Sequence, residues 1–160
     1  MGVGQIVVYG GHGPGRVIAR TTQTTDAVVQ EVVVLELAAT LMVTLPLPLA
    51  REQLRPLANE QELKGVQRTL RASPPVEEPL WLKRQKATRA KLAEGEPIGL
   101  AEVVSAGAHR QQGNHARLSV SERDLYLKAR RLLAAEIGHA RGIGPSQAED
   151  WITTQLAHAT

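Results

Sequence analysis

The sequence predicts an α+β protein, in which a small antiparallel β-barrel precedes a compact all-helical domain of about five helices. Short runs of β-branched residues, separated by Gly and Pro, occupy the chain up to Leu54 and predict strands. After Pro56 the apolar residues recur at helical spacing. A chain of 160 residues can hold two small domains. The change of periodicity divides it into residues 1–54 and residues 55–160.

Four strands are expected in the first domain, and the tight turns between them favour an antiparallel barrel. Their ranges are 5–9, 16–22, 27–37 and 41–45. The Gly-rich segment 10–15 is expected to form a hairpin turn in which Gly adopts positive φ. Pro46 and Pro48 would lie at the rim, where strand pairing needs no backbone N–H.

Five helices are expected in the second domain, over residues 59–71, 79–93, 97–109 and 119–141, with a last helix from Ser146. Ser119 with Glu122, and Ser146 with Glu149, have the spacing of capping boxes at the start of the last two helices. Gly95 and Gly142 are expected to end the helices that precede them.

Positive charge is concentrated in the second domain. The net charge is −1 up to Leu54 and +4 from Arg55 onward. The densest basic run has no acidic residue between positions 80 and 93, and consists of Lys83, Arg84, Lys86, Arg89 and Lys91. Such a run is typical of a nucleic-acid-binding helix, and also of an ordinary solvated helix face. Charge alone leaves both interpretations open.

Trp81 is one of only two Trp residues, and it directly precedes this basic run. An aromatic ring beside clustered cations can stack on bases or wedge between them while the cations contact phosphates. The alternative is a core position on a helical stripe with Gln85, Thr88 and Leu92, although its polar members argue against deep burial. Trp151, beside Ile152, is expected in the core.

Several kinds of site are excluded or left without support. The absence of Cys excludes disulfides, thiol nucleophiles and Cys-ligated metals. The five His have no metal-ligand spacing, and the Gly-rich segment departs from G-x-G-x-x-G. The acidic pairs at 77–78 and 149–150 lie beside Pro or near helix starts, where acids favour the helix dipole. We expect no enzyme activity, no metal and no cofactor.

The longest apolar stretch, residues 32–48, is interrupted by Glu36, two Thr and two Pro. Its β-branched residues favour strands over a membrane-spanning helix, and the N-terminus lacks the basic region of an export signal. We therefore expect a cytoplasmic protein that does not contact a membrane.

Seven short segments, spread over nearly the whole chain, have the order and spacing of one protein family. They are V-G-Q-I-V-V-Y-G-G-H-G-P-G (3–15), L-M-V-T-L-P (41–46), L-R-P (54–56), W-L-K-R (81–84), I-G-L-A-E-V-V (98–104), L-S-V-S-E-R (118–123) and A-R-R-L-L (129–133). Together they resemble the CarD/CdnL family of bacterial transcription regulators.

The resemblance implies a Tudor/SH3-like barrel, residues 1–54, that binds the RNA polymerase β subunit. It also implies a helical domain, residues 55–160, that contacts promoter DNA in the nucleoid. Trp81 matches the family Trp that wedges into the minor groove at the upstream edge of the melted region and stabilises the open complex. The resemblance and the basic run together predict these DNA contacts: Trp81, Lys83, Arg84, Lys86, Arg89, Arg123 and Arg130.

The expected polymerase-binding residues are Gln23, Met42 and Thr44. Family members often carry a basic residue where Gln23 and Thr44 stand, and Pro where Gly10 stands. Two alternatives follow. The chain could be a protein-interaction module of a divergent paralogue whose polymerase or DNA role is lost or exchanged. It could also be a small enzyme that binds a phosphorylated ligand at its Gly-rich segment.

Overall fold

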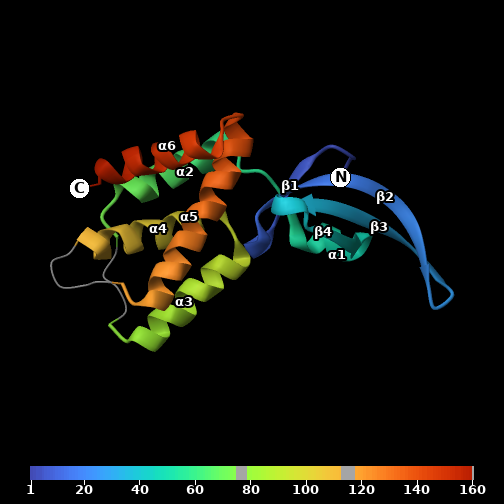
Figure 1. The fold of residues 1–160 in the computed structure, drawn as a ribbon, viewed down its shortest axis with the longest axis horizontal. Helices are drawn as coiled ribbons and strands as arrows, with labels where there is room; N and C mark the ends of the chain where they lie inside the picture. The colour runs from blue at the N-terminus through green and yellow to red at the C-terminus, as the bar shows by residue number, and fades with distance from the viewer. Residues whose placement is uncertain (75–78, 113–117, 160) are drawn as a thin grey trace. The chain divides into compact units, whose positions relative to one another are not determined.

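The computed structural model describes residues 1–74, 79–112 and 118–159 (Figure 1). The chain divides into two compact units, Met1–Leu57 and Ala58–Thr160. The first contains an antiparallel sheet and the second contains helices, so the α+β class predicted from the sequence is confirmed. The acidic pair Glu77–Glu78 and one of the five His, His115, lie outside the described residues.

The sheet of the first unit has five strands in the order β4-β3-β2-β1-β5, and every pairing is antiparallel. The strands are β1 (Ile6–Tyr9), β2 (Pro14–Thr25), β3 (Val28–Leu37), β4 (Met42–Pro46) and β5 (Leu54–Pro56). Short 3₁₀ turns, η1 (Gly10–His12) and η2 (Ala38–Thr40), precede β2 and β4. β4 and β5 lie at the two ends of this order, so the described pairings form an open sheet and do not close the expected barrel.

Two elements of the first unit differ from the sequence expectation. Pro46 and Pro48 were expected at a barrel rim, but they open the short helix α1 (Leu47–Gln53), since Pro is well suited to a first helical turn. The three-residue strand β5 then pairs with Val7–Tyr9. α1 buries Leu47 and Ala50 in the same cluster as Val33 and Leu35 of β3, and so completes the small core of this unit.

The β2–β3 hairpin extends beyond both neighbouring strands (Figure 1). It turns at Asp26 and Ala27, which both have positive φ, 50° and 62°. Two residues of positive φ suit the right-handed twist of a hairpin, but Ala pays a steric cost there that Gly does not. The Gly-rich segment between β1 and β2 behaves as expected, with positive φ at Gly10 and Gly13.

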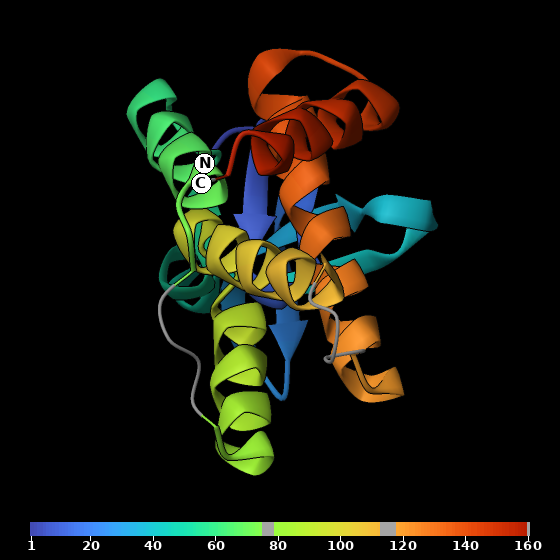
Figure 2. The same cartoon turned by 90° about the vertical axis from the view of Figure 1, so that its left-hand side faces the viewer.

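The second unit contains five helices, and α1 brings the described helices to six. They are α2 (Glu60–Arg71), α3 (Trp81–Glu94), α4 (Pro97–Gln112), α5 (Val120–Arg141) and α6 (Pro145–Ala157). α4 packs on α5 at the centre, with α2 and α6 on one side and α3 on the other (Figures 1 and 2). The side chains that are fully buried between them include Leu63, Leu70, Leu100, Leu133, Ile137 and Ile152.

Helix ends follow local sequence rules at most sites. α2 begins with a complete capping box between Asn59 and Glu62, and Gly95 and Gly142 end α3 and α5 with positive φ. The expected box at Ser146 and Glu149 is wrong. The N-cap of α6 is Gly144, two residues before Ser146, and its backbone N–H donates to Gln147 Oε1 at 3.2 Å. None of the described helices is long and apolar enough to cross a membrane.

Replacing Ala27 with Gly removes the steric cost of positive φ in the hairpin turn. We expect Ala27→Gly to raise the free energy of unfolding by about 0.5–1 kcal/mol, measured by urea denaturation. Ala90→Gly is the matched control, because Ala90 is exposed in the middle of α3 and Gly there should destabilise by about 0.5–1 kcal/mol. Equal destabilisation by both changes would contradict this account of the turn.

Candidate functional site

Trp81 is the first residue of α3, and 43% of it is exposed. Its indole Nε1–H, the only polar group of the side chain, donates to Glu122 Oε1 at 2.8 Å. One edge of the ring is therefore attached to the start of α5, while much of its apolar surface faces solvent. The exposure agrees with the interpretation of Trp81 as a surface residue and not as a core residue.

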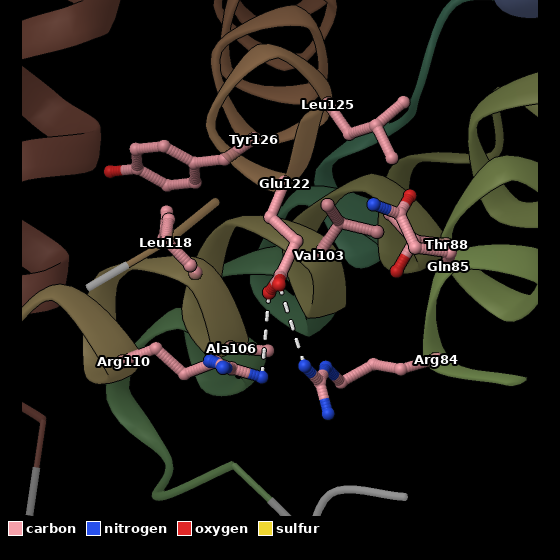
Figure 3. A pocket seen from close by; sticks show the side chains of 11 residues that line it. Arg84, Gln85, Thr88, Val103, Ala106, Arg110, Leu118, Glu122, Leu125 and Tyr126 are labelled. Carbon is pink, nitrogen blue, oxygen red and sulfur yellow. Dashed lines mark hydrogen bonds and ion pairs between the residues drawn. The ribbon is translucent and has the colours of Figure 1, made fainter. Parts of the chain in front are cut away.

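The carboxylate of Glu122 also binds two arginines from different helices. Arg84 Nη2 of α3 lies 3.4 Å from Oε1, and Arg110 Nη1 of α4 lies 3.4 Å from Oε2. Figure 3 shows both guanidinium groups directed at the carboxylate. The Glu122 side chain is only 13% exposed. One carboxylate thus connects α3, α4 and α5.

Local sequence places these groups together. Trp81 and Arg84 are three residues apart, so they lie on the same face of α3. The hydroxyl of Ser119 accepts from the Glu122 backbone N–H at 3.2 Å, which forms one half of the expected capping box. That hydroxyl also donates to Glu122 Oε1 at 3.2 Å. The carboxylate therefore accepts hydrogen bonds from Ser119 and Trp81 and forms ion pairs with both arginines.

A small pocket of about 50 Å³ lies beside this carboxylate, between α3, α4 and α5 (Figure 3). Gln85 lines it and is buried, and its Nε2 donates to Ser121 Oγ at 2.8 Å. Gly107 allows the close packing of Tyr126, because a Cβ at this position would lie 2.5 Å from Tyr126 Cδ2. Pockets for small ligands are usually about 300–1,000 Å³, so this pocket is too small for a nucleotide.

The other cations of α3 that are predicted to contact DNA face solvent. Lys83, Lys86 and Arg89 are exposed, and so is Arg123 on the first turn of α5. Three apolar residues at the starts of α3 and α5 are exposed as well: Leu80 (56%), Leu82 (75%) and Val120 (80%). Exposed apolar side chains accompanied by cations are a common feature of binding surfaces.

Arg130 lies two turns further along α5 and is held by α6. Its Nε donates to Glu149 Oε2, its Nη1 to the Tyr126 hydroxyl at 3.1 Å, and its Nη2 to Thr153 Oγ1. Burial disfavours its charge, but the hydrogen bonds to Glu149 and Tyr126 outweigh burial and raise the pKa of Arg130. These bonds join α5 to α6 and leave the side chain 17% exposed.

The residues nominated for polymerase binding share one face of the sheet. Gln23 pairs with Gln30, Thr44 with Val34, and Met42 with Glu36. The three partners are an even number of residues apart along β3, so their side chains point to the same face, on which Val32 is buried. Gln23, Met42 and Thr44 are all exposed, whereas Val33 and Leu35 on the opposite face are buried.

Two residues of the Trp81 site were not nominated from the sequence. The sequence predicts a helix cap at Glu122. That role accounts for its bonds to Ser119 but gives no sign of the bonds that its carboxylate makes to other helices. Arg110 carried no local signal, because its partner is distant in the chain. Trp151, expected in the core, is only partly buried and packs against the Arg141 guanidinium, 4.8 Å from its ring centroid.

Comparison with known protein families gives two matches. Residues 1–58 match the family described as CarD-like/TRCF RID domain. Residues 65–153 match the family described as CarD, C-terminal domain, and this match covers more than half of the chain. The gap between the two matches lies next to the division between the two compact units.

The bonds of Arg130 predict a structural role that can be measured. Arg130→Ala should lower the free energy of unfolding by about 1–3 kcal/mol, because it leaves Glu149 without a charge-assisted partner. Arg131→Ala is the control, since Arg131 is exposed on the same helix and its loss should cost about 0.5 kcal/mol or less. Equal melting curves for the two variants would contradict the assignment.

Proposed function

The chain belongs to the CarD/CdnL family of non-enzymatic, RNA polymerase-interacting regulators, and we propose that it stabilises the open promoter complex. In this proposal residues 1–54 bind the RNA polymerase β subunit and residues 55–160 bind promoter DNA. Trp81 inserts at the edge of the melted region. The observation that carries the proposal is the half-exposed Trp81, held at one edge and accompanied by exposed cations.

The chemistry of this surface suits a junction between paired and melted DNA. Exposed bases offer ring faces on which an indole can stack, and backbone phosphates attract Lys83, Lys86, Arg89 and Arg123. The cations bind without regard to sequence, whereas the ring gains contacts only where bases are unstacked. The protein therefore binds the open state more tightly than the closed state, and this difference shifts the equilibrium.

The proposed polymerase-binding surface is the exposed face of β2, β3 and β4. Met42 supplies an adaptable apolar contact, and Gln23 and Thr44 supply polar ones. Because the two basic residues common in the family are absent, electrostatic steering should contribute little to this association.

The neutral side chains at positions 23 and 44 also favour a second candidate function. A divergent paralogue could have exchanged its polymerase partner for another protein while it kept the same sheet surface. DNA binding by the second unit is independent of that exchange, so the two candidates differ at the first unit only.

Loss of the indole ring should abolish the effect on the open complex. If stacking contributes about 1–3 kcal/mol, Trp81→Ala should shorten the lifetime of the open complex by about 5- to 150-fold in competitor-challenge assays. Trp151→Phe is the matched control, since Trp151 packs within the second unit and the change keeps an aromatic ring there. An unchanged lifetime with Trp81→Ala would overturn the wedge role.

Binding of the full chain to the N-terminal lobe of the polymerase β subunit discriminates the two candidate functions. We expect the native chain to bind with about micromolar affinity or better. A Gln23→Arg, Thr44→Arg variant should bind more tightly and with greater salt dependence. Affinities are measured by calorimetry. If the double variant binds and the native chain does not, the result would favour the second candidate function, in which the polymerase has been exchanged for another partner.

A further inference from the structure

We propose that Glu122 is a positioning residue that holds Trp81 in the orientation in which it meets DNA. This inference rests on the proposed function, and it assigns a role to a residue that itself contacts no DNA in the proposal. It also separates the arginines that support the site from the cations that face solvent.

The position of Trp81 in the fold makes such support necessary. It is the first residue of α3, the preceding Leu80 provides no side-chain cap, and nearly half of the residue is exposed. An exposed aromatic residue at a helix start would sample several rotamers, and binding would then cost conformational entropy. The bond from Nε1–H to Glu122 Oε1, at 2.8 Å, selects one orientation before DNA binds. It also directs the polar edge of the ring inward and leaves apolar surface exposed.

Glu122 can do this because its own carboxylate is held. Arg84 and Arg110 approach different oxygens at 3.4 Å each, and Ser119 Oγ donates to Oε1 at 3.2 Å. These partners come from α3, α4 and the cap of α5, so rotation of the carboxylate would break bonds to all three. Acceptors with charged and hydrogen-bonded supports hold a functional side chain more firmly than a single contact does.

The same geometry assigns Arg84 a different role from its neighbours on α3. Its side chain is 18% exposed and is directed at Glu122, whereas Lys83, Lys86 and Arg89 face solvent. We therefore place Arg84 with Arg110 as supports of the carboxylate, and leave the phosphate contacts to the exposed cations.

A simpler role for Glu122 would be that of an acidic residue in the first turn of α5, which favours the helix dipole. Trp81→Phe separates the two roles, because Phe keeps an aromatic ring but has no N–H to donate. If Glu122 acts through the indole, replacing Glu122 should shorten the open-complex lifetime in the native chain. The same replacement should have little effect on the lifetime in a chain that already carries Trp81→Phe.

The test uses the full chain and four variants: Glu122→Ala, Glu122→Gln, Trp81→Phe, and Glu122→Ala combined with Trp81→Phe. Glu102→Gln is the matched control. It removes one negative charge from an ion pair with Lys91, which also joins α3 to α4 but does not involve Trp81. Melting curves establish that each variant folds, and Glu122→Gln serves as the test if the Ala variant does not.

The first readout is independent of DNA. The chain has two indole N–H groups, so nuclear magnetic resonance can follow hydrogen exchange at Trp81 with Trp151 as an internal reference. We expect Glu122→Ala to accelerate exchange at Trp81 at least about tenfold, which corresponds to loss of one charge-assisted hydrogen bond. Glu122→Gln keeps an oxygen acceptor and should show a smaller change, and Glu102→Gln should show none.

The second readout is the lifetime of the open complex. Glu122→Ala should shorten it by about 2- to 13-fold, the range expected when one ordered side chain becomes mobile. Added to Trp81→Phe, the same change should alter the lifetime by less than about twofold.

The outcomes separate this inference from the proposed function. Unchanged indole exchange in Glu122→Ala would overturn the positioning role whatever the lifetimes. Faster exchange with an unchanged lifetime, while Trp81→Ala shortens the lifetime, would also overturn it but leave the proposed function standing. If Trp81→Ala has no effect on the lifetime, the proposed function and the positioning role both fail.

Discussion

The carboxylate of Glu122 is the contact on which the candidate site depends. It lies where α3, α4 and α5 meet, and it binds the Trp81 indole, Arg84 and Arg110. Without it two partly buried arginines would lose the negative charge that they share. The same group therefore stabilises the packing of three helices and sets the position of the exposed ring. Function and fold are coupled at this point of the second unit.

Positive charge in the second unit has two separate uses. Arg84 and Arg110 bind Glu122, and Arg130 binds Glu149, so these arginines join helices to one another. Lys83, Lys86 and Arg89 are exposed on α3 and can contact phosphates. Arg suits the first use because its planar group forms several directed bonds, whereas the second use needs only an exposed positive charge, which the two lysines and Arg89 all supply. Net charge alone does not distinguish the two groups.

Periodicity and turn residues predicted β1 to β4 and the five helices of the second unit, because local preferences and tertiary packing agree there. They did not predict α1, since two prolines that end a strand can equally open a helix, nor the three-residue β5, whose pairing with β1 is not local. The exposure of Trp81 could be predicted from the polar residues on its helical stripe. The role of Glu122 in this site could not, since its partners on the other helices lie 12, 38 and 41 residues away along the chain. For the same reason the sequence predicts a helix cap at Glu149, whereas in the structure Glu149 binds Arg130.

The most direct test of the account compares binding of the full chain to a forked promoter fragment and to a fully paired duplex of the same length, over a range of salt concentrations. In the proposed function the exposed cations contact the backbone of both DNAs, so affinity for each should fall with salt at a similar slope. The fork should be preferred by at least about fivefold at every salt concentration, since stacking of Trp81 needs an unpaired base. Equal affinity for the two DNAs would contradict the assignment of this surface to a melted junction.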